Sequence, residues 1–277
     1  RGHGDRALMQ NAWNAQWSHN RYRAYWPGTM GGAVWSMYDY NRGCCDNICY
    51  SGVADVFRLP KFSLSYFRTQ VPAGTPVPGG TMPYDVFICS HWLEDAPDTV
   101  QVYGNVDEVE LRLNGRPLAR RHPDNGPSTD YVPVPDGGNA TNVTFPPFTF
   151  FGVDREPGEL TAVGYKNGRP VAEHTVRTPG APAALSIDYF EGGYPASRND
   201  LLIVYVSLRD GNGTLCFDEN GREVRLEVLQ GGELRGPAQV KAEAGIASFL
   251  VATADVRTLK VRAASEGWQA TKKWQLE

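Results

Sequence analysis

Hydrophobic residues near the start of the chain recur with the period of a helix. After Asp5 the apolar positions fall every three or four residues, at Leu8, Met9, Ala12, Trp13 and Trp17. Such spacing places side chains on one broad face of a helix. We therefore predict a helix that begins at Asp5, its N-cap, and ends near Tyr25. Trp13 and Trp17 are expected in the buried stripe of this helix.

A short, almost uncharged segment follows at residues 31–37. This composition is typical of a parallel strand buried on both faces. Pro60 fits the first turn of a second helix. The apolar residues of that helix are Phe62, Leu64, Tyr66 and Phe67. Helix, buried strand, loop and helix form an α/β arrangement that amounts to about a quarter of an eight-fold barrel.

Beyond a linker at residues 71–80, the hydrophobic period drops to two. The alternating runs are separated by turn dipeptides, at Asn114-Gly115, Asn167-Gly168 and Asn220-Gly221. Such dipeptides favour tight turns between antiparallel strands, and a second proline- and glycine-rich boundary lies at residues 179–182. Regularly spaced short strands predict immunoglobulin-like β-sandwiches.

The predicted fold is therefore mainly β. Two immunoglobulin-like β-sandwiches follow the final helix–strand–helix portion of a (β/α)8 TIM barrel. We assign residues 1–72 to the C-terminal remnant of this barrel, 73–178 to the first sandwich and 179–277 to the second.

Composition narrows the class of protein. A formal charge of −4 over 277 residues offers no basic face for nucleic acid, and no apolar run reaches the ~18–20 residues of a membrane span. Cys44, Cys45 and Cys49 lack a CxxC pair and a fourth ligand at a standard interval, so we interpret them as thiols. No cofactor is expected.

The candidate binding residues are Trp35, Asp39 and Arg42, which follow the predicted barrel strand. Barrels hold ligands at the C-terminal ends of their strands. An indole gives a flat platform for a sugar ring, and a carboxylate and a guanidinium make charge-assisted hydrogen bonds to its hydroxyls. The residue types leave an alternative open, in which Trp35 caps the barrel core and Asp39 forms a loop salt bridge with Arg42.

Three runs of residues resemble glycoside hydrolase family 2, in its bacterial β-galactosidase branch. They are Trp35-x-x-x-Asp39-Tyr40-Asn41-Arg42-Gly43, Ser51-Gly52-Val53-Ala54-Asp55 and Phe57-Arg58-Leu59-Pro60-Lys61-Phe62-Ser63. Residues 103–115 are similar to the start of the sandwich that follows the barrel in that family, and residues 179–277 resemble an invasin-like immunoglobulin module. The resemblance covers the whole chain and is strongest over residues 31–115.

The resemblance implies a retaining hydrolase of non-reducing β-linked sugars, in which two glutamates act as acid/base and nucleophile. The first glutamate of this chain is Glu94, in the predicted sandwich. The chain is therefore expected to carry part of the sugar subsite, with Trp35 against the sugar and Asp39 and Arg42 at the rim. It is expected to lack the catalytic pair and to be inactive alone.

The resemblance also implies partners and a location. The expected partners are a β-galactoside or related glycan and the N-terminal portion of a parent enzyme, with a homo-oligomer left open. A periplasmic or secreted bacterial protein is expected. The alternative function is a non-catalytic tandem immunoglobulin-like module that binds polysaccharide or a surface partner. A role for His19 and Asn20 at the site, or for Trp92, Trp268 and Trp274 as a binding platform, is less favoured than packing.

Overall fold

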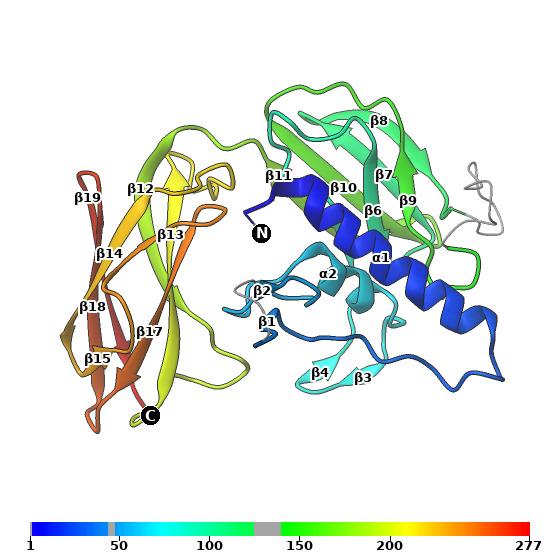
Figure 1. Ribbon diagram of the computed structural model, residues 1–277. Helices are drawn as coiled ribbons and strands as arrows, with labels where there is room; N and C mark the ends of the chain where they lie inside the picture. Colours follow the sequence, from blue (N-terminus) through cyan, green and yellow to red (C-terminus); the bar gives the residue numbers. More distant parts are fainter. Residues whose placement is uncertain (1, 44–47, 125–139) are drawn as a thin grey trace. The chain divides into compact units, whose positions relative to one another are not determined.

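The computed structural model describes residues 2–43, 48–124 and 140–277. It divides into two compact units (Figure 1), which we call unit 1 (His3–Thr178) and unit 2 (Pro179–Glu277). The further division of unit 1 into a barrel remnant and a sandwich stays a prediction.

Unit 1 is built on a β-sandwich. One sheet has the strand order β5-β6-β9 and the other β11-β10-β7-β8. The strands are β5 (Val86–Ile88), β6 (Val100–Gly104), β7 (Glu108–Leu113), β8 (Arg116–Arg121), β9 (Phe148–Phe150), β10 (Glu159–Lys166) and β11 (Arg169–Arg177). Short pairs β1 (Tyr40–Asn41) with β2 (Ile48–Cys49) and β3 (Pro76–Val77) with β4 (Gly80–Thr81) complete the unit.

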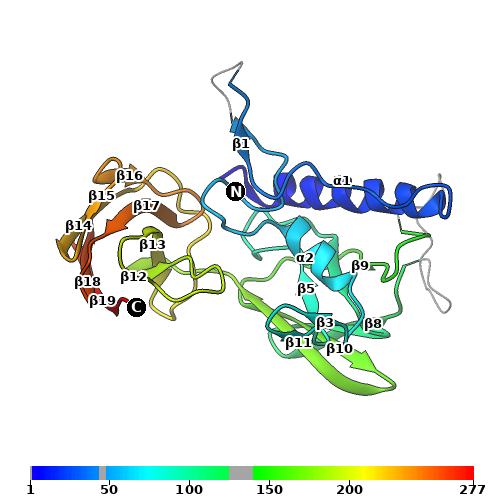
Figure 2. The ribbon, with the colours of Figure 1, turned by 90° about the horizontal axis from the view of Figure 1, so that it is seen from below.

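The three-stranded sheet is buried on both faces, which explains how the helices are held. Val86 and Ile88 of β5 point into the sandwich core. Cys89 and Tyr103 belong instead to a second cluster on the opposite face. Alternate side chains of a strand point to opposite faces. The helices α1 (Gly4–Ala24) and α2 (Phe62–Thr69) pack on that second face and lie side by side (Figure 1 and Figure 2).

The helix α1 ends where the sequence predicts, but its start and its buried face differ. His3 occupies the N-cap position, and the carboxylate of Asp5, in the first turn, accepts hydrogen bonds from Ser90 Oγ and the His91 backbone. The buried stripe is Asp5, Leu8, Ala12, Gln16 and Asn20.

The expectation that Trp13 and Trp17 are core residues is wrong, because they are 44% and 41% exposed. Their stripe is offset by one residue from the stripe of Leu8 and Ala12, which is a rotation of about 100° around the helix. It therefore faces away from the sheet. The second helix is confirmed, although Pro60 precedes its N-cap, Lys61, instead of lying in the first turn.

The buried strand predicted at residues 31–37 is also wrong. This segment is extended but largely exposed, and parallel pairing begins only at its end, through the bridge Tyr38↔Ala54. Among the described residues, no strand lies beside residues 31–35. A parallel strand needs neighbours to satisfy its backbone, so this segment does not form one here.

The predicted hairpins are confirmed at two turns. Asn114-Gly115 joins β7 to β8 and Asn167-Gly168 joins β10 to β11, with positive φ at all four residues as a type I′ turn requires. Asn220-Gly221 connects β13 to β14, which belong to different sheets, so this turn does not form a hairpin.

Unit 2 is a second sandwich, with sheets ordered β12-β13-β17-β15 and β16-β14-β18-β19. Its strands are β12 (Pro182–Tyr189), β13 (Leu201–Asp210), β14 (Glu223–Gln230), β15 (Gly232–Leu234), β16 (Gln239–Lys241), β17 (Ile246–Thr253), β18 (Thr258–Ser265) and β19 (Trp268–Gln275). The alternating apolar residues meet between the sheets, so the mainly β fold with two sandwiches is confirmed.

The three tryptophans of the sandwiches pack against the cores of their units. Trp92 is fully buried in unit 1, where Arg155 covers its ring and its Nε1 donates to the carbonyl of Glu156. Trp268 and Trp274 pack half-buried against the core of unit 2. In the parts of the chain that the structure describes, no helix is long and apolar enough to cross a membrane.

Candidate functional site

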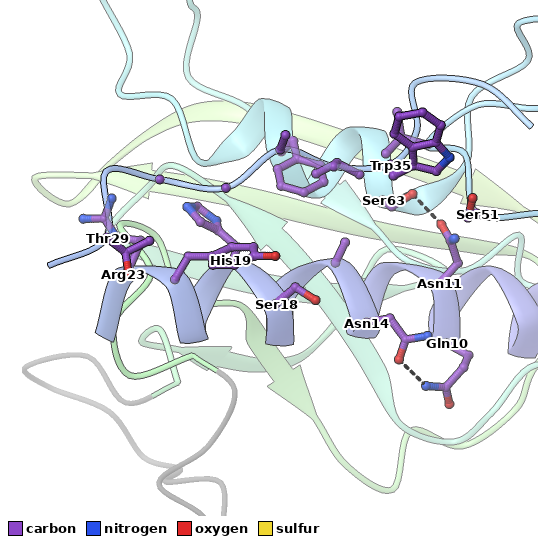
Figure 3. Close-up of a pocket in the computed structure, with 18 of the residues that line it drawn as sticks. Gln10, Asn11, Asn14, Ser18, His19, Arg23, Thr29, Trp35, Ser51 and Ser63 are labelled. Carbon is purple, nitrogen blue, oxygen red and sulfur yellow. Dashed lines mark hydrogen bonds between the residues drawn. The ribbon is translucent and has the colours of Figure 1, made fainter. Parts of the chain in front are cut away.

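A pocket of about 1310 Å³ lies in unit 1 between α1 and the extended segment of residues 29–35. Figure 3 shows α1 along one side of it, with Trp35, Ser51 and Ser63 at one end and His19 and Arg23 at the other. The lining is contributed by α1, the extended segment, residues 50–53 and the first turn and middle of α2. The pocket is therefore lined by the segment predicted as the barrel strand and by the regions before and after it in the sequence.

Trp35 presents a flat aromatic surface at this pocket. Its side chain is 75% exposed. Its Nε1 donates a hydrogen bond to Tyr40 Oη at 2.8 Å, and the two rings meet edge to face. An indole held at its nitrogen and open on its face suits the C–H face of a sugar ring.

The α1 side of the pocket is lined by amides and hydroxyls. Asn11 Oδ1 accepts from Ser63 Oγ at 2.5 Å, and Gln10 Nε2 donates to Asn14 Oδ1 at 3.0 Å, as Figure 3 shows. Each amide retains further donors and acceptors that can meet a neutral, hydroxyl-rich ligand. These residues extend the predicted site; their only sequence signal was their place on the polar side of the first helix.

His19 lines the far end of the pocket and contacts a buried tyrosine. Its Nδ1 lies 2.8 Å from Tyr66 Oη. Burial, with the charge of Arg23, lowers the pKa of His19, so the neutral ring is favoured. Asn20 is directed elsewhere, since its Oδ1 accepts the backbone N–H of Asn142 at 2.7 Å. The packing interpretation of these two residues therefore fits their contacts.

Asp39 lies beneath the site instead of lining it. Its Oδ1 accepts from Lys61 Nζ at 2.6 Å and from the backbone N–H of Gly52 at 2.9 Å. The side chains of Asp39 and Lys61 are 2% and 3% exposed. The alternative interpretation paired Asp39 with Arg42 in a loop salt bridge. Asp39 does form a salt bridge, but its partner is the buried Lys61.

Arg42 directly follows β1 and is exposed. Its Nη2 donates to Cys49 Sγ at 3.2 Å. Hydrogen bonds from Ser51 first, then from Tyr40 and Arg42, lower the pKa of the Cys49 thiol to about 6 despite partial desolvation. Cys44 and Cys45 lie outside the described residues, and the described part of the chain holds no cluster of three or more metal-ligating side chains.

The three predicted binding residues therefore occupy three different settings. Trp35 lines the pocket, Asp39 is buried outside the lining and Arg42 is exposed just after β1. No carboxylate is among the described residues that line the pocket. The aromatic face and the polar side chains of the lining suit a polar ring. Lys61 was not predicted as the partner of Asp39, although it lies in the run of residues 57–63 that carries the family resemblance.

Known proteins are similar to this chain in sequence and in fold. A family described only as "Domain of unknown function (DUF4982)" matches residues 96–172. The β-galactosidase of Thermoanaerobacter pseudethanolicus is 32% identical over 79% of this chain. The β-galactosidase BoGH2A of Bacteroides ovatus is 25% identical over 74% of it. The chain spans 29% and 22% of the lengths of these two relatives.

Solved structures agree on the fold. A β-glycosidase from Bacteroides vulgatus superposes with a TM-score of 0.71 at 17% identity, covering 93% of this chain and 32% of its own. A β-glucuronidase from glycoside hydrolase family 2 gives a TM-score of 0.71 at 20% identity, covering 95% of this chain and 27% of its own. Together, these relatives and structures support the chain as a C-terminal fragment of a glycoside hydrolase family 2 enzyme.

Proposed function

We propose that this chain supplies one wall of the sugar-binding site of a β-galactosidase-like enzyme that hydrolyses non-reducing β-linked sugars. The observation that carries this proposal is Trp35, which presents an open indole face at a pocket lined by amides and hydroxyls. That combination suits a neutral pyranose, which offers an apolar C–H face and several hydroxyls.

A β-galactoside is the proposed substrate because the relative at 32% identity is named a β-galactosidase. Arg42, at the rim of the site, is proposed to contact substrate hydroxyls beyond the ring held by Trp35. Its guanidinium lies outside the pocket lining, so its contribution is expected to be smaller than that of Trp35.

The chain is proposed to act with catalytic groups that it does not itself contain. A retaining hydrolase needs two carboxyl groups roughly 5 Å apart, one as nucleophile and one as acid/base. No glutamate precedes Glu94 in the sequence, and the described pocket lining has no carboxylate. We expect the pair to come from the N-terminal portion of the parent enzyme.

The first test is an assay of the purified, folded chain against a chromogenic β-galactoside. We expect no turnover, and clear turnover would overturn the proposed division of labour. Binding is tested separately by titrating galactose and following the tryptophan resonances by NMR. We expect weak, saturable shifts of the Trp35 indole signal, which Trp35→Ala removes and Trp17→Ala, an exposed tryptophan outside the pocket, leaves in place.

We also propose that the parent enzyme is exported to the periplasm or secreted, in keeping with its resemblance to bacterial polysaccharide-degrading enzymes. Cell fractionation of the source organism with an antibody to unit 2 tests this location. A homo-oligomer is proposed as a further possibility for the parent enzyme, and sedimentation of that enzyme tests it.

A further inference from the structure

A single buried ammonium lies where three segments of the pocket wall converge. Lys61 Nζ donates to Asp39 Oδ1 at 2.6 Å and to the carbonyl of Tyr50 at 3.0 Å. The Lys61 backbone N–H donates to the carbonyl of Val53 at 3.0 Å. One residue therefore connects residues 36–39, residues 50–54 and the start of α2.

Each of these segments carries part of the site. Trp35 lies four residues before Asp39, and Tyr50 and Ser51 line the pocket directly. Ser63, two residues after Lys61, also lines it and donates to Asn11 of α1. Lys61 itself does not line the pocket, so any effect on a ligand must pass through these neighbours.

We propose that Lys61 is a positioning residue for sugar binding, and that Asp39 acts through Lys61 instead of touching the sugar. This inference rests on the proposed function of the pocket. The Asp39 side chain is almost fully buried, and its Oδ1 is shared between Lys61 and the backbone of Gly52. The pair therefore sets where the segment after Trp35, residues 36–39, lies.

The packing around the pair leaves little room for another arrangement. A β-carbon on Gly52 would lie 2.3 Å from the Asp39 backbone nitrogen and 2.5 Å from the Ala54 carbonyl oxygen. Asp39 N–H donates to that same carbonyl at 3.0 Å. The backbones of residues 36–39 and 52–54 are thus in contact at Gly52. We therefore expect a shift of Asp39 to move all of residues 36–39, and Trp35 with them.

The energetics of buried charge point the same way. Burying two charges costs desolvation free energy, and the attraction between them often does no more than offset that cost. A buried ion pair is therefore weak evidence for stability. Its attested use is to select one geometry over others. Here the geometry selected is that of the pocket wall.

The test uses the indole N–H resonance of Trp35, identified by its loss in Trp35→Phe. In Lys61→Met we expect this resonance to move, because the Trp35–Tyr40 hydrogen bond is displaced. The Trp92 resonance, whose Nε1 is bonded to Glu156, should stay in place and shows that the unit is folded. Lys61→Arg, which keeps the charge, should restore part of the Trp35 position.

Galactose titration then measures the consequence for binding. We expect Lys61→Met to raise the dissociation constant for galactose at least ten-fold. Lys61→Arg should raise it less. The matched control is Arg68→Met on the same helix, which removes a more exposed ion pair with Asp85 and should leave both Trp35 and the affinity unchanged.

An unmoved Trp35 resonance with unchanged affinity in folded Lys61→Met overturns the proposal. If Lys61→Met loses the Trp92 resonance as well, Asp39→Asn, which keeps the side-chain shape, takes its place with the same two outcomes. If galactose shifts nothing in the unmodified chain, the proposed function fails. The movement of Trp35 on loss of Lys61 still decides whether the residue positions the wall.

Discussion

Unit 2 and the N-terminal region of unit 1 use their apolar residues in different ways. In unit 2 the alternating residues of β13, β14, β17 and β18 meet one another and form a closed core. In residues 3–70 many large apolar side chains face solvent: Trp13, Trp17, Tyr22, Tyr25, Trp26, Met30, Val34, Trp35, Met37 and Tyr50. Six of these side chains line the pocket: Tyr22, Trp26, Met30, Val34, Trp35 and Tyr50.

The two regions also differ in what holds them. The core of unit 2 is a continuous apolar cluster. The N-terminal helices are fastened by a small apolar cluster together with buried polar contacts: Asp5 with His91, Asn20 with Asn142, and Asp39 with Lys61. Polar contacts are directional and specify position, whereas apolar burial supplies most of the stability.

The largest effect should come from the closed core of unit 2. Leu226 is fully buried there, and we expect Leu226→Ala to lower the free energy of unfolding of unit 2 by about 2–5 kcal/mol, through lost burial and a cavity. Urea denaturation followed by circular dichroism measures this. An effect no larger than that of the exposed control Leu229→Ala would contradict the comparison.

Loss of the Asp5 anchor should be the next largest effect. Burial by itself would raise the pKa of Asp5, but hydrogen bonds from His91 and Ser90 and the charge of His91 together hold that pKa below its usual value. Asp5→Ala removes the buried acceptor of these hydrogen bonds, so we expect a loss of about 1–3 kcal/mol. Hydrogen exchange should rise first in the N-terminal half of α1.

The same anchor has a defined dependence on pH. Because the folded-state pKa of Asp5 lies below its ordinary value of 3.8, its contribution is present above that value and is lost as the pH falls through the folded pKa. Acid titration should therefore loosen α1 below about pH 4, and Asp5→Asn should reduce this response. A response unchanged in Asp5→Asn would show that another carboxylate is responsible.

Asp124, at the end of β8, should show the opposite dependence on pH. Burial raises its pKa to about 6, although Thr149 donates hydrogen bonds from its backbone and its hydroxyl. The protonated form is favoured in the fold, so stability from this group falls as the pH rises from about 4 to about 6.

The isosteric change Asp124→Asn tests this dependence. At about 1.4 kcal/mol for each pKa unit, it should raise stability at pH 7 by up to about 2 kcal/mol relative to pH 4. Urea denaturation of both proteins at the two pH values gives the difference. Equal stability differences at both pH values would refute the expectation.

The smallest effect should come from the exposed tryptophans of α1. Replacing Trp13 and Trp17 together by Gln should change the free energy of unfolding by less than about 1 kcal/mol, because each side chain remains more than two-fifths exposed. Binding of a hydrophobic dye should fall. A loss of several kcal/mol would mean that this stripe packs within the chain, which would remove the contrast with unit 2.

The sequence by itself determined the sandwiches more completely than the helical region. Alternation around Asn114-Gly115 and Asn167-Gly168 specifies both the strands and the turns that pair them, because neighbouring strands are also neighbours in sequence. The two helices were likewise determined by local periodicity. The runs at residues 35–43, 51–55 and 57–63 carried the resemblance to glycoside hydrolase family 2, and the 32% identical β-galactosidase agrees with it.

Only the tertiary structure decided which faces and partners those residues have. The apolar spacing assigned Leu8 and Trp13 to one broad face of α1, yet the two side chains lie about 140° apart around the helix, and the sheet buries Leu8 and leaves Trp13 exposed. Asp39 pairs with Lys61, 22 residues away, instead of with the nearby Arg42. Charge type and spacing cannot distinguish these cations, because pairing depends on which backbone segments meet. The parallel contact of residues 36–39 with 53–54 brings Asp39 to Lys61, and that contact exists only in the folded chain.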